Sequence, residues 1–210
     1  MNTVQFSSPN LPPPSYHEIA RYMKAGTSNQ EAELLIGKSI LECEKQIVGK
    51  IAYSEFPIHC TNGSLDLGFA TTKSSDLEKL LCDNSCSSII LFSATIGLGI
   101  DRLLFKYSRT SPATALCIQA IGAERVEALC NAFSLEMKEK YASLGCTLTP
   151  RFSPGYGDLP LSLQKDIFAA LDCEKHLGLT LNDSLLMSPT KSVTAIIGIK
   201  KTLRTTYENS

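Results

Sequence analysis

The chain has 210 residues, 43% hydrophobic and 20% charged, which is enough for one compact domain to bury roughly 70% of its unfolded surface. Its 20 basic and 21 acidic side chains leave a net charge of -1. This argues against a general binder of nucleic acid or anionic membranes, since such proteins carry a basic excess. No apolar run approaches the roughly 20 residues of a membrane span. The first residues, MNTVQF, lack the basic and apolar regions of a signal peptide.

The cysteine pattern indicates free thiols. Because no export signal is present, the eight cysteines are expected to be reduced in the cytoplasm. The closest pair, Cys82 and Cys86, has no second pair and no nearby histidine, so no zinc site is expected. The histidines fall in different expected elements, and a structural or solvated role is expected for His17, His59 and His176.

The first half of the chain predicts an extended segment followed by helices and then strands. Residues 1–14 are expected to form an extended leader, because proline disfavours helix around 12–14, and 15–210 are expected to form a single domain. The apolar pattern predicts helices over 15–24 and 28–45, β structure over 47–58 and an alternating strand over 64–69.

The central region predicts a buried strand between helices. A capping box, Ser75-x-x-Glu78, predicts a short helix through Leu81. The continuous apolar run 88–92 predicts a central strand. Ser111-Pro112 predicts the start of the longest helix, which should continue to about Tyr141 with a kink near Gly122.

The last third predicts a strand over 146–152, a Gly/Pro loop, a helix over 161–171 and strands near 177–181 and 192–199. Helices and strands mix without strict βαβ alternation. The sequence therefore predicts an α+β fold with a mixed, largely antiparallel sheet flanked by helices.

The segment Gly97-Leu98-Gly99 lies between a predicted strand and helix, as a dinucleotide-binding loop would. The third glycine of that motif would fall at Arg102, whose side chain would obstruct close packing, so a tight turn is predicted instead. Asp101 and Arg102 are interpreted either as facing a cleft or as capping the helix at the surface, and capping is favoured.

The most informative stretch is the loop 149–161, whose three prolines and two glycines fix an irregular backbone. Arg151 offers a planar fork for a carboxylate or phosphate, Tyr156 offers a ring face, and Gly155 lets a ligand approach the main chain. The alternative is a rigid turn with Arg151 in a salt bridge. Ser153 does not lie in a G-x-S-x-G motif, and no base that could activate it is identifiable, so a role as catalytic nucleophile is not expected.

At this loop the sequence resembles the activation domain of cobalamin-dependent methionine synthase, and more closely its small stand-alone relatives. The segment 151–156, Arg-Phe-Ser-Pro-Gly-Tyr, matches the family's Arg-x-x-x-Gly-Tyr signature. The segment 187–195 is similar to the family's Met-x-Pro-x-x-Ser-Val-Ser-Gly, and 94–102 and 120–127 are similar to the stand-alone relatives. The resemblance implies an activation-domain-like fold that binds S-adenosylmethionine.

The resemblance also implies roles for particular residues. Arg151 would pair with the ligand carboxylate, the main chain at Ser153 would bond the adenine, and Tyr156 would lie against the ligand. Gly155 and Glu127 complete the expected binding set, with no catalytic residue and no metal ligand. The chain departs from the family in the residues Ile196 and Ile197, where the synthase domain has aromatic side chains, and Gln119, where an acidic residue is expected.

The resulting hypothesis is an accessory protein that reactivates a methionine synthase lacking its own activation domain. The cobalamin would be carried by that partner, and a flavodoxin-like protein would donate the electron. Because the sulfonium methyl is already activated, the protein needs only to hold it in line with cobalt, and no general base is required. An independent methyltransferase and a non-catalytic sensor of S-adenosylmethionine are the alternatives.

Overall fold

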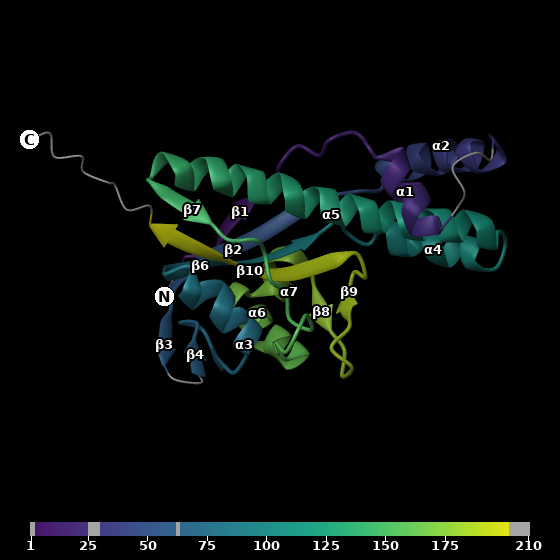
Figure 1. Ribbon diagram of the computed structural model, residues 1–210. Helices are drawn as coiled ribbons and strands as arrows, with labels where there is room; N and C mark the ends of the chain where they lie inside the picture. Colours follow the sequence, from purple (N-terminus) through teal and green to yellow (C-terminus); the bar gives the residue numbers. More distant parts are fainter. Residues whose placement is uncertain (1–2, 25–29, 62–63, 202–210) are drawn as a thin grey trace, which may run out of the picture.

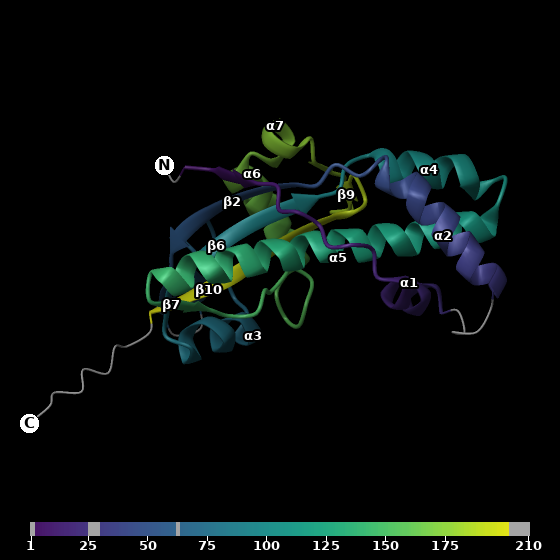
Figure 2. The same ribbon diagram turned by 90° about the horizontal axis from the view of Figure 1, so that it is seen from above.

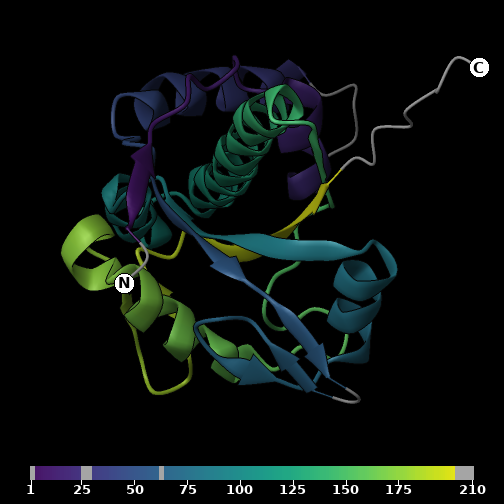
Figure 3. The same cartoon turned by 90° about the vertical axis from the view of Figure 1, so that its left-hand side faces the viewer.

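The computed structural model of the protein describes residues 3–24, 30–61 and 64–201. A five-stranded antiparallel sheet in the order β1-β2-β6-β10-β7 lies at its centre (Figure 1). Seen end-on, the sheet separates a layer of long helices from a layer of short elements (Figure 3). This confirms the predicted α+β class. The strands of the sheet are β1 Gln5–Ser7, β2 Lys50–Pro57, β6 Cys86–Thr95, β7 Cys146–Leu148 and β10 Ser192–Lys201.

Strand β6 lies in the middle of the sheet and is buried on both faces. Ile90 and Phe92 pack on the helical side, whereas Ile89 and Leu91 pack on the other side. This two-sided burial explains why the sequence shows a continuous apolar run here and not an alternating one.

We call the first layer the helical layer; it comprises α1 Tyr16–Met23, α2 Gln30–Glu44, α4 Gly99–Ser108 and α5 Pro112–Ser143. Helix α5 has 32 residues, about 48 Å at 1.5 Å per residue, and lies along the sheet (Figure 2). It passes Gly122 without interruption, and the expected kink stays a prediction. A Cβ at Gly122 would lie 2.8 Å from Ile100 Cγ2, so the glycine is needed for the close approach of α4.

Residues 3–14 of the leader are held against the rest of the chain both by a strand and by a buried ion pair. Residues 5–7 form β1, which pairs with β2. Further along, the Arg125 side chain, 1% exposed, donates to Glu124 Oε2 at 2.5 Å and to Pro12 O at 2.7 Å. Glu124 Oε1 also accepts from Ser15 N at 3.2 Å. A buried ion pair on α5 therefore fixes the path of the leader into α1.

We call the second layer the small-element layer. Its strands and helices are short: β3 His59–Thr61, β4 Ser64–Asp66, β5 Thr71–Thr72, α3 Ser75–Glu78, the π turn η1 Lys79–Asp83, the 3-10 turn η2 Leu161–Leu163, α6 Gln164–Leu171, α7 Cys173–Leu177, β8 Thr180–Leu181 and β9 Met187–Ser188.

Local predictions fail at β4, at α3 and at β7. The strand expected over 64–69 ends at Asp66, because the Asp66 side chain accepts from Gly68 N and turns the backbone. The N-cap of α3 is Ser74, which accepts from Leu77 N at 3.1 Å, and not Ser75. The strand expected over 146–152 stops at residue 148, and only a single β-bridge forms at Phe152.

The expectation of eight free thiols is also wrong, because Cys60 and Cys82 form a disulfide. They are 22 residues apart in sequence, and the packing of β3 against η1 brings them together. The inference of a reducing compartment loses this support, and a cytoplasmic location stays a prediction. The other six cysteines are free.

Within the described ranges, no group of His, Cys, Asp and Glu side chains could hold a metal ion. No helix in the same ranges is long and apolar enough to cross a membrane.

Candidate functional site

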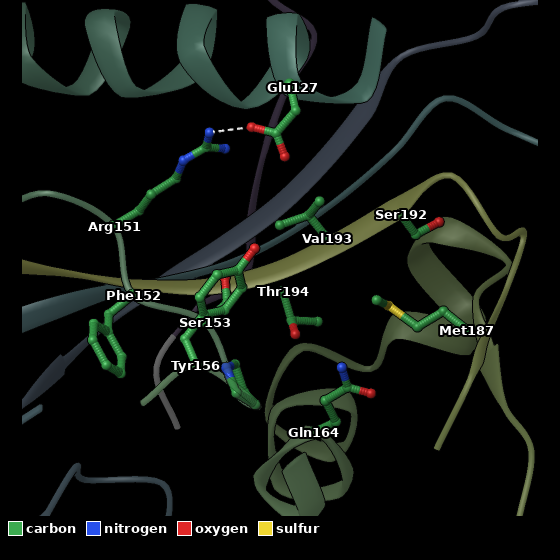
Figure 4. Close-up of a pocket in the computed structure, with 11 residues that line it drawn as sticks. Glu127, Arg151, Phe152, Ser153, Tyr156, Gln164, Met187, Ser192, Val193 and Thr194 are labelled. Carbon is green, nitrogen blue, oxygen red and sulfur yellow. Dashed lines mark hydrogen bonds and ion pairs between the residues drawn. The ribbon is translucent and has the colours of Figure 1, made fainter. Parts of the chain in front are cut away.

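A cavity of about 390 Å³ opens where the loop 151–156 faces the start of β10 (Figure 4). Helix α5 bounds it on one side of the strand, and α6 bounds it on the other. Its volume falls within the range of about 300–1,000 Å³ typical of small-molecule sites. The residues that line it are Glu127, Arg151, Phe152, Ser153, Pro154, Tyr156, Gln164, Met187, Ser192, Val193 and Thr194.

The cavity lies along an unpaired edge of β10. Phe152 and Ile196 exchange two backbone hydrogen bonds of 2.8 Å, which fixes the loop against the strand. Backbone groups at every second residue of a strand point to the same side. The peptide groups of Thr194 and Ser192 therefore face the loop side of β10, beyond the Phe152 bridge, and border the cavity.

Arg151 makes an ion pair with Glu127 of α5 through Nη2 (Figure 4). The same nitrogen donates to Asn131 Oδ1 at 3.2 Å. The other terminal nitrogen, Nη1, is buried and makes no hydrogen bond. The salt bridge that the sequence left as an alternative is thus present, yet the guanidinium keeps donor capacity for a second anion.

The loop is tied to α3 by one carboxylate. Asp158 accepts from Ser75 N at 2.7 Å, from Ser75 Oγ at 2.6 Å and from Asp76 N at 3.2 Å, and it also accepts from Ser74 Oγ. The hydroxyl donors of Ser74 and Ser75 lower the pKa of Asp158 well below its ordinary value, and the backbone N–H groups add to this effect. The charged carboxylate therefore fixes the loop at neutral pH.

The other wall, which includes Met187 and Ser192, is tied to α4. Asp101 accepts from Thr190 Oγ1 at 2.5 Å and from Thr190 N at 3.3 Å. Asp101 thus neither faces the cavity nor caps its own helix; it fixes the turn before β10. Arg102 is exposed on α4.

Four of the five expected binding residues line the cavity: Glu127, Arg151, Ser153 and Tyr156. Gly155 does not line it. Its φ of 88° lies in the left-handed region, and its N–H donates to Leu159 O at 2.9 Å, so this glycine shapes the loop from behind.

The residues that depart from the family pattern lie outside the cavity. Ile196 and Ile197 are buried on opposite faces of the sheet, so neither takes the place of an aromatic ligand contact. Gln119 is exposed on α5 and is absent from the lining.

Sequence reasoning missed Gln164, which is 5% exposed and lines the cavity. A signal was available: Gln164, Ile167 and Leu171 follow the i, i+3, i+7 spacing of one helical face, and all three are buried. A polar residue at an apolar position of that pattern marks a buried side chain that needs a hydrogen-bonding partner.

The cavity offers binding groups and no obvious nucleophile. Its lining contains no cysteine and no histidine. The Cys130 thiol lies close to Arg151, but burial raises its pKa to about 12, which keeps it protonated and unreactive.

A second, larger groove of about 780 Å³ lies between the leader and α5, on the far side of Glu127 and Asn131. Its lining is mostly apolar, with contributions from Leu11, Ala128 and Leu135. The smaller cavity is the better candidate site, because it combines a charged pair with buried polar groups that lack partners.

The chain has an activation-domain-like fold. The comparison that carries this fold assignment is with a solved structure described as the MetH reactivation domain bound to AdoHcy, S-adenosylhomocysteine. The TM-score is 0.65 at 15% sequence identity, over 93% of this chain and 78% of that one. Comparison with known protein-family models and with curated proteins gives no match.

Proposed function

We propose that the cavity binds S-adenosylmethionine and its product S-adenosylhomocysteine. The observation that carries the proposal is the Arg151–Glu127 pair at one end of a cavity, in a fold shared with a domain whose solved structure holds S-adenosylhomocysteine. The amino-acid end of either ligand has a carboxylate and an ammonium group. The guanidinium of Arg151 and the carboxylate of Glu127 complement these two charges.

In this proposal Arg151 is shared between Glu127 and the ligand. Nη2 keeps its bond to Glu127, while the buried Nη1 donates to the ligand carboxylate and gains the partner it lacks. The ring of Tyr156, whose residue is 69% exposed, lies against the sulfonium and the ribose, where a cation–π contact contributes. The main chain at Ser153 bonds the adenine.

The chemistry is methyl transfer to cobalamin carried by a partner, a methionine synthase that lacks its own activation domain. That cobalamin, reduced from cobalt(II) to cobalt(I) by one electron from a flavodoxin-like donor, would supply the nucleophile that accepts the methyl group, and cleavage of the carbon–sulfur bond would release S-adenosylhomocysteine. The residues of this chain bind and orient the sulfonium, which is catalysis by proximity. The absence of a cysteine or histidine from the cavity is compatible with this role.

Calorimetry with S-adenosylhomocysteine tests the binding step. Arg151→Ala should weaken binding about 10- to 150-fold, since it removes a charge-assisted contact of roughly 1.5–3 kcal/mol. Tyr156→Ala should have a smaller effect. Arg102→Ala, which removes an exposed arginine outside the cavity, is the matched control and should bind like wild type. Equal binding by wild type and Arg151→Ala would show that the ion pair is structural.

Reconstitution tests the reactivation step. A truncated synthase with cobalt(II) cobalamin should recover activity only when this protein, S-adenosylmethionine and a reductant are all present. The cofactor spectrum should change from cobalt(II) to methylcobalamin as S-adenosylmethionine is consumed. Ligand binding without this conversion would favour the sensor, and turnover of another acceptor without a corrinoid protein would favour the independent methyltransferase.

A further inference from the structure

Two buried polar side chains line the cavity on the face of β10 opposite Arg151 and Glu127. Gln164, at the start of α6, is 5% exposed, and Thr194, on β10, is 2% exposed. Neither Gln164 Oε1 nor Thr194 Oγ1 has a hydrogen-bonding partner. In Figure 4 both side chains extend from their backbones into the same part of the cavity, below the strand.

Buried polar atoms without partners are rare in folded proteins, because each costs the desolvation of that atom with no compensating bond. Because Gln164 and Thr194 both line one cavity, a ligand bound there could supply the missing bonds. The neighbouring secondary structure does not require these groups: Ile167 and Leu171 occupy the same face of α6 as Gln164 and are apolar.

The two ends of the cavity differ in charge, and this difference indicates which part of the ligand binds at each end. Arg151 and Glu127 are charged and match a zwitterionic amino-acid group. Gln164 and Thr194 are neutral and match a neutral polar group. Proteins commonly hold ribose hydroxyls with a carboxylate, whereas a carboxamide is suited to the donor and acceptor edge of adenine.

We propose that Gln164 and Thr194 form the base-recognition end of the cavity, in which Gln164 Oε1 accepts from the 6-amino group of adenine and Thr194 Oγ1 bonds a neighbouring ring nitrogen. The inference rests on the proposed function, since it assumes a ligand with an adenine at one end and an amino acid at the other. It adds to that function a specificity for the base, supplied by side chains on α6 and β10.

The test compares two ligands in calorimetry: S-adenosylhomocysteine and the analogue in which hydrogen replaces the 6-amino group. Wild type should bind the amino form about 5- to 150-fold more tightly, because the analogue leaves Gln164 Oε1 buried and unpaired. Gln164→Met, similar in size and without the acceptor, should bind both ligands with nearly equal affinity. Gln30→Met makes the same change at an exposed position on α2 and should keep the wild-type preference.

Thr194→Val is a second, independent variant that removes only the hydroxyl and keeps the shape. It should weaken binding of both ligands, while the preference for the 6-amino group remains. The wild-type comparison itself requires no variant, so it tests the inference even if a buried substitution prevents folding.

The outcomes separate this inference from the function on which it rests. Failure of wild type to bind S-adenosylhomocysteine would overturn the proposed function. Tight binding without preference for the 6-amino group, or a preference that Gln164→Met retains, would overturn base recognition alone. A third ligand, the 2′-deoxyribose analogue of S-adenosylhomocysteine, tests the ribose. If wild type discriminates against this analogue and Gln164→Met does not, the site belongs to the ribose, and base recognition is overturned.

Discussion

The helical layer and the small-element layer cover opposite faces of one sheet, and each buries an apolar cluster against it, but the two layers are built from different elements (Figure 3). In the helical layer a few long helices bury apolar stripes, and one 32-residue helix contacts α1, α2 and α4. In the other layer the elements are short, and point contacts add to the apolar cluster that they bury: the Cys60–Cys82 disulfide, the Asp158 carboxylate on α3 and side-chain-bonded turns.

The two layers contribute different parts of the cavity. A cavity that must hold a ligand in one orientation needs irregular backbone, and the small-element layer supplies it in the loop 151–156. The helical layer contributes a rigid wall through Glu127 on α5. Breaking the first layer should unfold the protein, whereas breaking the second should chiefly misplace the loop.

The largest effect is expected from a core cavity in α5. Leu129 is fully buried, and Leu129→Ala should destabilise the protein by about 2–5 kcal/mol, since it removes apolar contacts and leaves a void. The midpoint of denaturant unfolding measures this change. Leu135→Ala, six residues along the same helix at a side chain 57% exposed, is the control and should change stability by less than about 0.5 kcal/mol. Similar losses in both variants would contradict the assignment of the core.

The next largest effect is expected from the disulfide. Replacing Cys60 and Cys82 by serine opens a loop closed across 22 residues, which should cost about 3 kcal/mol in the chain-entropy account. Hydrogen exchange should increase in β3, β4 and η1 and change little in α5. The partly exposed free thiol Cys146, replaced by serine, is the control. Uniform loss of protection across both layers would show that the two layers unfold as one unit.

A smaller, local effect is expected at the loop anchor. Because the folded pKa of Asp158 is lowered, its stabilisation is complete above the ordinary carboxyl range and is lost as pH falls from about 4 through the lowered pKa. Asp158→Asn should weaken S-adenosylhomocysteine binding about three- to tenfold at pH 7. The variant should also lose less stability than wild type as the pH falls below about 4, because it lacks the titrating carboxyl group. Unfolding followed by circular dichroism at several pH values measures this difference.

Asp183→Asn, at an exposed aspartate between β8 and β9, should leave both measurements unchanged. If Asp158→Asn binds like wild type, the loop keeps its shape without this carboxylate.

The last prediction concerns the reactivity of the cysteine thiols and involves no substitution, so no change in stability is expected. Denatured, non-reduced protein should show six reactive thiols, and eight after reduction. In native protein Cys43, Cys130 and Cys173 should react slowly, because burial raises their pKa values to about 12, 12 and 11. Eight reactive thiols before reduction would rule out the disulfide.

Local sequence determined most of the helical layer and the fold class. Apolar periodicity placed α1, α5 and the central strand β6, and Pro112 set the start of α5, because these signals depend on neighbours within a few residues. The loop 149–161 was also recognised from its own glycines, prolines and arginine, and four of the residues expected in the site line the cavity.

Tertiary structure alone decided the contacts between distant segments. The Cys60–Cys82 pair, the Asp158 anchor on α3 and the Arg125 bond to Pro12 join residues that no short-range pattern relates. Gln164 joins the cavity only because α6 packs against the sheet, beside an edge of β10 that the Phe152 bridge leaves open. Side chains distant in sequence acquire a shared environment only when the sheet and both layers pack, and that environment decides which polar groups remain available to a ligand.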